Sequence, residues 1–396
     1  MRPLLQLLFA LSSLSGFSQN AWCGTGLPDQ QAELESKINV ESRSTITIPV
    51  VFHVLWKDSV ENISDERIYS QLDVLNTDFR ALNANLKVLS KEKQNLAADM
   101  QIEFCLAFVD PFGNPAKGIT RKQTSIDNIG TQNTVSIPSK AFIKNSSLGG
   151  TDAWDTEKYL NIWIGKFQSN TILAESKFPW DTIRSEDGIR IDPEYVGIHC
   201  VDALKKRFSY GRTLTHEVGH YLGLLHPWSA DCTLGDQVQD TPPQRNAYYD
   251  CNKVDDDECG YIPLVENFMQ FSDDLCLALF THDQKKRVDQ MISKYRPKLL
   301  SNNVSCFPFY YPTELTEDNL NFYPNPSTGC VMVDIDLDTK LEIELEIFDA
   351  TGRLIHQESN IVMSIRPIEI NFLQSGMYFV RAKSNGKSVT KKIIVL

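Results

Sequence analysis

The most informative part of the chain is residues 215–226, Thr-His-Glu-Val-Gly-His-Tyr-Leu-Gly-Leu-Leu-His. His216 and His220 are four residues apart, so on a helix both imidazoles lie on the same face and can bind one metal ion. Glu217 lies beside them, where it can hold a water against the metal without being a ligand itself. The stretch therefore predicts a metal-binding helix.

The end of the same stretch completes the metal site. Gly223 ends the helix and permits a sharp turn, which brings His226 back toward the metal as a third ligand. Three neutral imidazoles with an open fourth position are typical of catalytic zinc, because structural zinc sites are closed by four protein ligands. We therefore expect one catalytic Zn²⁺, which activates a water and polarises a carbonyl, with Glu217 as the general base.

Strand and helix patterns alternate on the N-terminal side of this motif. β-branched and aromatic residues predict strands at 45–56, 100–109 and 159–165. Ser64 caps a predicted helix with an apolar stripe, and a last helix is predicted at 283–296. This order predicts an α+β fold over residues 44–305, in which a twisted, mostly parallel sheet is covered by a backing helix and the zinc helix.

Composition and the N-terminal residues indicate an exported protein. The net charge of −12 in 396 residues argues against a nucleic-acid binder, which needs a basic face. Arg2, an apolar run at 4–11 and Gly-Phe-Ser at 16–18 predict a signal peptide over residues 1–18. No later stretch reaches 18 uninterrupted apolar residues, so no transmembrane helix is expected.

The nine cysteines are therefore expected in an oxidising environment, as disulfides plus one left over. Four of them bracket the acidic loop after the zinc motif: Cys232, Cys251, Cys259 and Cys276. These four allow three pairings. No pairing is predicted for Cys105, Cys200, Cys306 and Cys330.

The C-terminal part of the chain has a different pattern. Prolines and polar residues at 306–319 predict a linker. Six short strands separated by turns follow at 331–336, 341–349, 353–357, 361–371, 377–383 and 388–395. They predict a small all-β, immunoglobulin-like sandwich over residues 320–396.

The zinc motif, followed by Asn-Phe-Met-Gln-Phe at 267–271, resembles the metzincin metalloproteases, in which a methionine turn follows the zinc helix. Further segments resemble the pappalysin family: Tyr-Leu-Asn-Ile-Trp at 159–163, Asp187-Gly188, Asp240-Thr241-Pro242 and Phe280-Thr281 with Gln284. The resemblance implies a metzincin-like catalytic domain with an irregular, disulfide-stapled lower subdomain. It also implies a secreted zinc metalloendopeptidase that hydrolyses peptide bonds of extracellular proteins. In that family the methionine, here Met269, forms an apolar floor beneath the metal.

The same resemblance implies further roles. It favours the crossed pairs Cys232–Cys259 and Cys251–Cys276. Structural calcium is expected at Asp236, Asp240 and Thr241, whose hard oxygen ligands suit that ion. Residues 19–43 are expected to be a propeptide that makes the enzyme a latent precursor. In it, the thiolate of Cys23 would fill the open zinc position until cleavage near Arg43, although an unpaired or disulfide-linked cysteine is the alternative.

Two residues depart from the pappalysin pattern. Phe271 replaces the usual tyrosine two residues after the methionine, so a hydroxyl that can reach the zinc or the developing oxyanion is missing. Leu275 replaces an aspartate before the fourth cysteine, although Asp273 and Asp274 remain. The sequence therefore does not predict which substrate side chain is preferred directly after the cleaved bond. The substrate is expected to lie along a sheet edge at 172–178.

Two other functions are consistent with the motif. A metzincin-fold surface binding protein or adhesin with weakened catalysis would explain Phe271, but it has no reason to keep Glu217 with all three histidines. An enzyme that hydrolyses a non-peptide amide on the same scaffold is the second alternative.

Residues 320–396 resemble the C-terminal sorting domain of the type IX secretion system. The resembling segments are 322–329, 347–353, 375–380 and 391–396. The resemblance implies recognition by the secretion machinery during outer-membrane passage, followed by release or surface attachment. A carbohydrate- or protein-binding sandwich is the alternative.

Overall fold

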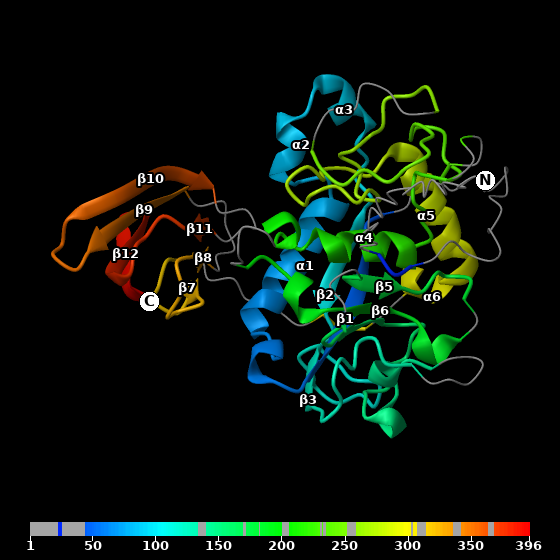
Figure 1. Ribbon diagram of the computed structural model, residues 1–396, viewed down its shortest axis with the longest axis horizontal. Coiled ribbons are helices and arrows are strands. Elements are labelled where there is room, and N and C mark those ends of the chain that lie inside the picture. Colours follow the sequence, from blue (N-terminus) through cyan, green and yellow to red (C-terminus); the bar gives the residue numbers. More distant parts are fainter. Residues whose placement is uncertain are drawn as a thin grey trace, which may run out of the picture.

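The fold is taken from a computed structural model of the chain (Figure 1). The structure describes residues 23–25, 44–133, 140–168, 172–181, 183–199, 206–229, 232, 235–251, 259–301, 304–306, 314–335, 342–362 and 368–396. The predicted signal peptide, Arg43, Cys200 and residues 307–313 of the predicted linker lie outside these residues. No helix in the described ranges is long and apolar enough to cross a membrane.

The part of the chain before the tail is organised around a six-stranded mixed sheet. Its order is β2-β1-β4-β6-β5, and β3 also pairs with β1. All pairings are parallel except that of β5 with β6, so the predicted mostly parallel mixed sheet is confirmed. The strands are β1 (Ile46–Trp56), β2 (Ile102–Leu106), β3 (Ile119–Gln123), β4 (Leu160–Ile164), β5 (Ala174–Ser176) and β6 (Ile189–Ile191).

The long first strand is buried because it is paired along both edges and covered on both faces. Its first half pairs with β2 and its second half with β3, while β4 runs along the other edge. Nearly every side chain of β1 is buried, which explains its continuous apolar run. β1 is therefore the rigid centre from which the site is built.

Helices cover the sheet on the side of the metal motif (Figure 1). The predicted backing helix and last helix are confirmed as α1 and α5. Ser64 caps α1 as expected, and α5 is capped by Thr281, for which no capping role was predicted. The helices are α1 (Asp65–Phe79), α2 (Ala84–Val88), α3 (Lys91–Leu96), α4 (Arg212–Tyr221), α5 (His282–Tyr295) and α6 (Pro297–Leu300). Apolar side chains of α1, α4 and α5 form one buried cluster with the sheet.

A buried arginine ties the end of the metal helix to the sheet. Arg296, directly after α5, donates from Nη2 to Asp187 Oδ1 at 2.7 Å and from Nε to the carbonyl of Tyr221 at 3.2 Å. Its guanidinium also stacks over the Tyr221 ring, 3.7 Å from the ring centroid. Tyr221 ends α4 and Asp187 precedes β6, so one charge fixes two elements that are distant in sequence.

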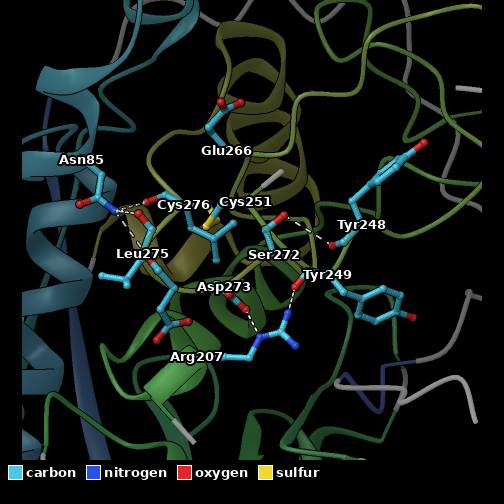
Figure 2. The surroundings of a disulfide bond; sticks show 12 residues. Asn85, Arg207, Tyr248, Tyr249, Cys251, Glu266, Ser272, Asp273, Leu275 and Cys276 are labelled. Atoms are coloured by element: carbon cyan, nitrogen blue, oxygen red, sulfur yellow. Dashed lines mark hydrogen bonds and ion pairs between the residues drawn. A yellow bond between two sulfur atoms is a disulfide. The ribbon is translucent and has the colours of Figure 1, made fainter. Parts of the chain in front are cut away.

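Three disulfides join described cysteines. Cys232 pairs with Cys259 and Cys251 with Cys276, which is the crossed arrangement that the resemblance implied (Figure 2 shows the second). Cys105 of β2 pairs with Cys306, a bond that the sequence alone did not predict. It spans 201 positions of sequence and so ties the end of the catalytic part back to its sheet.

The tail is built from two antiparallel sheets with a shared apolar core. The sheets are β10-β9-β12-β13 and β11-β8-β7. The strands are β7 (Leu320–Tyr323), β8 (Val331–Ile335), β9 (Glu342–Asp349), β10 (Leu354–Val362), β11 (Ile368–Ile370), β12 (Gly376–Ser384) and β13 (Lys387–Val395). β7 was not predicted, and β10 runs through the break expected at 358–360 because its bulges absorb the irregular pattern.

Replacing Arg296 by methionine should destabilise the protein strongly. The variant leaves the buried Asp187 carboxylate without its main cation, which costs about 3–5 kcal/mol of unfolding free energy in comparable cases. Urea denaturation of the Glu217→Ala protein, with and without Arg296→Met, measures the difference. Lys298→Met, which removes an exposed pair with Glu157, is the control and should change little. Equal effects of the two variants would contradict the role given to Arg296.

Candidate active site

Three histidines converge beside the sheet edge. His216 and His220 lie on α4, and His226 returns after the turn at Gly223, whose φ is +98°. The Nε2 atoms of His216, His220 and His226 lie 3.0–3.1 Å from one another. All three side chains are buried. The structure thus brings the three predicted ligands to one point.

The other ring nitrogens are held by backbone carbonyls. His216 Nδ1 donates to the Phe268 carbonyl at 2.9 Å, and His220 Nδ1 donates to the Leu224 carbonyl at 2.8 Å. Since a carbonyl only accepts, each Nδ1 carries the proton and each Nε2 presents its lone pair to the common point. Burial lowers the pKa of His216 to about 4 and holds those of His220 and His226 well below the usual value. Neutral imidazoles are the form that binds zinc, so these residues fit the metal.

The methionine turn supports this cluster from below. Met269 is fully buried, and a Cβ on Gly219 of α4 would lie 2.4 Å from its Sδ. Glycine at 219 is therefore required for the helix to rest on the methionine. The Phe271 ring lies against His216 and His226, with centroids 5.6 and 5.1 Å away, so the position of the missing hydroxyl is beside the metal site.

A buried polar group holds the start of α4. Asp78 of α1 accepts a hydrogen bond from Thr215 Oγ1 at 3.0 Å and pairs with the Arg212 guanidinium at 3.4 Å. Arg212 is the first residue of α4, and all three side chains are buried. Sequence reasoning missed this anchor because Asp78 lies at the end of a helix otherwise recognised only by its apolar stripe.

Cys23 lies at the histidine cluster. Its Sγ and one ring nitrogen of each histidine all lie within 4.8 Å of one another, the only such group of three or more metal-binding side chains in the described ranges. Cys23 is a free cysteine. Burial and the charge of Glu217 both raise the pKa of its thiol, so a thiolate here requires a cation close by.

Residues 23–25 run along the edge strand β5. This strand lies within residues 172–178, the segment expected to bind the substrate. Cys23 pairs with Ala174, and Gly24 N donates to the Ala174 carbonyl at 2.8 Å. A Cβ on Gly24 would lie 2.9 Å from Ile172 Cγ2, which explains the glycine.

Thr25 makes a contact that sequence reasoning missed. Its hydroxyl donates to Glu217 Oε2 at 2.9 Å and accepts from Ser176 N at 2.8 Å. Burial raises the pKa of Glu217 to about 8, an effect opposed by its hydrogen bonds from Cys23 and Thr25. The Cys-Gly-Thr segment therefore engages both the histidine cluster and the carboxylate beside it.

A pocket opens beside His216 and Glu217. Its lining includes Leu173, Phe208, Thr213, Phe271, Asp274 and Leu277. Asp274 Oδ2 already accepts from the backbone N–H of Tyr210 at 2.9 Å, and burial raises its pKa to about 7. Asp273 instead pairs with Arg207, while Leu275 is exposed and outside the lining (Figure 2). Of the three residues weighed for substrate preference, only Asp274 faces the pocket.

The expected calcium residues are only partly together. Thr241 Oγ1 donates to Asp236 Oδ1 at 2.6 Å, and the buried Asp236 Oδ2 has no hydrogen-bond partner. Asp240 instead caps α5, accepting from Thr281 Oγ1 at 2.7 Å and Asp283 N at 2.8 Å.

Three imidazoles on a helix and its following turn, resting on a buried methionine in an α+β fold, define a zinc metalloprotease. A sequence profile described as pregnancy-associated plasma protein-A matches residues 144–293, and one described as a secretion system C-terminal sorting domain matches residues 321–396. An extracellular metalloprotease of Verticillium alfalfae is 29% identical over 284 residues, 68% of this chain and 84% of that protein.

Solved structures agree. A promirolysin mutant and mature mirolysin in complex with a cleaved peptide, both from Tannerella forsythia, each have a TM-score of 0.58 and 35% identity to this chain. Each match covers 65% of this chain, and they cover 84% and 99% of those chains respectively. The chain belongs to the pappalysin family of metalloproteases and carries a type IX secretion tail. It is a secreted or cell-surface zinc metalloprotease, and an inactive binding protein is not favoured.

Proposed function

We propose that His216, His220 and His226 hold the catalytic zinc of an endopeptidase that cuts extracellular proteins, with Glu217 as its general base. The approach of the three Nε2 atoms to within 3.1 Å of one another carries this proposal. When bound, zinc supplies a Lewis acid that activates water and polarises the scissile carbonyl. Glu217 takes the proton of the attacking water and returns it to the departing amine nitrogen. β5 holds the extended substrate by its backbone.

The enzyme is made as a latent precursor. In this proposal Cys23 provides the fourth zinc ligand while Thr25 binds the general base, so both catalytic groups are occupied by one short segment. Two observations support these roles: Cys23 Sγ lies at the histidine cluster, and the Thr25 hydroxyl donates a 2.9 Å hydrogen bond to Glu217. Cleavage near Arg43 would separate residues 19–43 from the catalytic domain and free the edge of β5.

The chain is divided, in the same proposal, into a signal peptide (1–18), propeptide (19–43), catalytic domain (44–305), linker (306–319) and sorting domain (320–396). The two-sheet arrangement of the tail supports an immunoglobulin-like sandwich that the type IX machinery recognises.

A structural calcium ion bound at Asp236 is the second proposed cofactor. The buried Oδ2 without a hydrogen-bond partner supports it, since an ionised buried carboxylate needs a cation or donors. Thr241 would contribute a second oxygen from the same loop. Asp240 is left out of the proposed site, because both of its carboxylate oxygens accept hydrogen bonds at the start of α5.

Replacing Glu217 by glutamine should lower kcat/KM by about 10²–10⁴-fold without removing zinc, because the proton acceptor is lost while the imidazoles remain. Cleavage of a proteome-derived peptide library, read by mass spectrometry, and zinc stoichiometry by atomic absorption measure the two effects. The Cys23→Ser form is the parent, and Glu157→Gln is the exposed control. Undiminished cleavage, or zinc lost together with activity, would refute the assigned role.

Removing either contact of the Cys-Gly-Thr segment should activate the uncut precursor. Cys23→Ser frees the metal position and should raise the initial rate most. Thr25→Val removes a hydrogen bond to a charged group, of about 1.5–3 kcal/mol, and should raise it by roughly 10–100-fold. Rates are measured before any chain cleavage appears on a gel. Activation by Cys23→Ser with no effect of Thr25→Val would show that the Thr25 hydrogen bond does not contribute to latency.

Calcium should raise the melting temperature of zinc-loaded protein freed of calcium. At a concentration 100 times Kd the gain is about 2.7 kcal/mol, or roughly 5–10 °C. Asp236→Asn should abolish the shift in differential scanning calorimetry, and Asp318→Asn, at an exposed position of the proposed linker, should keep it. The same shift in both variants would reject the site.

A further inference from the structure

The tail packs against α1 and the segment before α4. Val74 of α1, Ile198 and Met332 of β8 form one cluster in which all three side chains are buried. Met332 is only 1% exposed. Figure 1 shows β8 and β11 on the side of the tail that faces α1. An apolar side chain of the tail is therefore covered by Val74 and Ile198 of the catalytic part.

Polar groups around this cluster also cross between the two parts. Tyr210, two residues before α4, donates its hydroxyl to Glu369 Oε2 of β11 at 3.2 Å. Tyr323 and Cys330 pack at the same place. Burial raises the pKa of the Tyr323 phenol, and the neighbouring Arg67 of α1 opposes that rise. The contact is thus specific in its polar as well as its apolar groups.

Cys330 lies at the same contact as Met332. It is disulfide-bonded, and it is the only cysteine between residues 314 and 396. Its partner therefore cannot belong to the tail. Of the other described cysteines, Cys23 is free and the remaining six pair among themselves.

We propose that the tail is a docked, disulfide-linked part of the protease, held by Cys330 and Met332 against α1 and the segment before α4. The buried cluster alone is small for an interface that must survive once the chain is cut. A disulfide keeps the two surfaces at a high effective concentration, so even a weak contact stays formed. Hydrolysis of one peptide bond between residues 306 and 314 would then leave the tail in place. Its release also needs a dithiol, which is oxidised to a disulfide as Cys330 and its partner become thiols.

The test uses the full-length chain carrying Glu217→Ala, to prevent self-digestion, and a viral protease recognition sequence inserted after residue 310. After cutting, the parent should run as one band at the mass of the uncut chain on a non-reducing denaturing gel, and as two bands with dithiothreitol. Cys330→Ser should give two bands in both. Peptide mapping should find Cys330 joined to a peptide from the catalytic part of the same chain. Since no activity is measured, the result is independent of the proposed catalytic function.

A second comparison isolates the surface contact. After cutting, the Cys330→Ser protein carrying Met332→Glu should separate into two species on native size exclusion. The same protein carrying Met377→Glu, an exposed methionine of β12, should separate less. Two bands from the cut parent without reductant would overturn the proposal, as would a Cys330 bond to a second copy of the chain. Equal separation of the two glutamate variants would show that Met332 does not hold the tail on the catalytic part.

Discussion

The three imidazoles meet at one point only because α4 is fixed at both ends. Asp78 holds its first turn through Arg212 and Thr215. Arg296 holds its last carbonyl and stacks on Tyr221. A rotation of the helix would move His216 and His220 away from His226, which follows the turn at Gly223. Buried charge pairs suit this task because they are directional, whereas apolar packing tolerates rotation.

The methionine turn supplies the third constraint on the same helix. Its Phe268 carbonyl fixes the His216 ring, and Met269 fills the space that Gly219 leaves open. The histidine site is therefore built from two segments distant in sequence, residues 216–226 and the methionine turn, joined by a backbone carbonyl and one close approach. The edge strand β5 forms a further side of the site, where Gly24 N donates to the Ala174 carbonyl and Ser176 N donates to the Thr25 hydroxyl.

The proposed latency and the proposed attachment of the tail rest on similar contacts at opposite ends of the catalytic part. At the N-terminal end, one short segment makes a sulfur contact and a hydroxyl contact at the histidine cluster and Glu217. At the C-terminal end, the tail combines a disulfide with a small buried cluster near the start of α4. In both cases a strong single contact is accompanied by weaker specific ones, which set the orientation of the segment.

The sequence by itself determined the metal motif, because four-residue spacing on a helix places two histidines on one face whatever surrounds them. It also determined the main strands, α1, α5 and the two-part organisation, since these follow from local periodicity and capping residues. Only the tertiary structure decided the partners of Asp78, Arg296 and Thr25, the Cys105–Cys306 bond, and the use of Asp240 as a helix cap. These contacts join residues up to 201 positions apart, and such pairing depends on how elements pack and not on any local pattern.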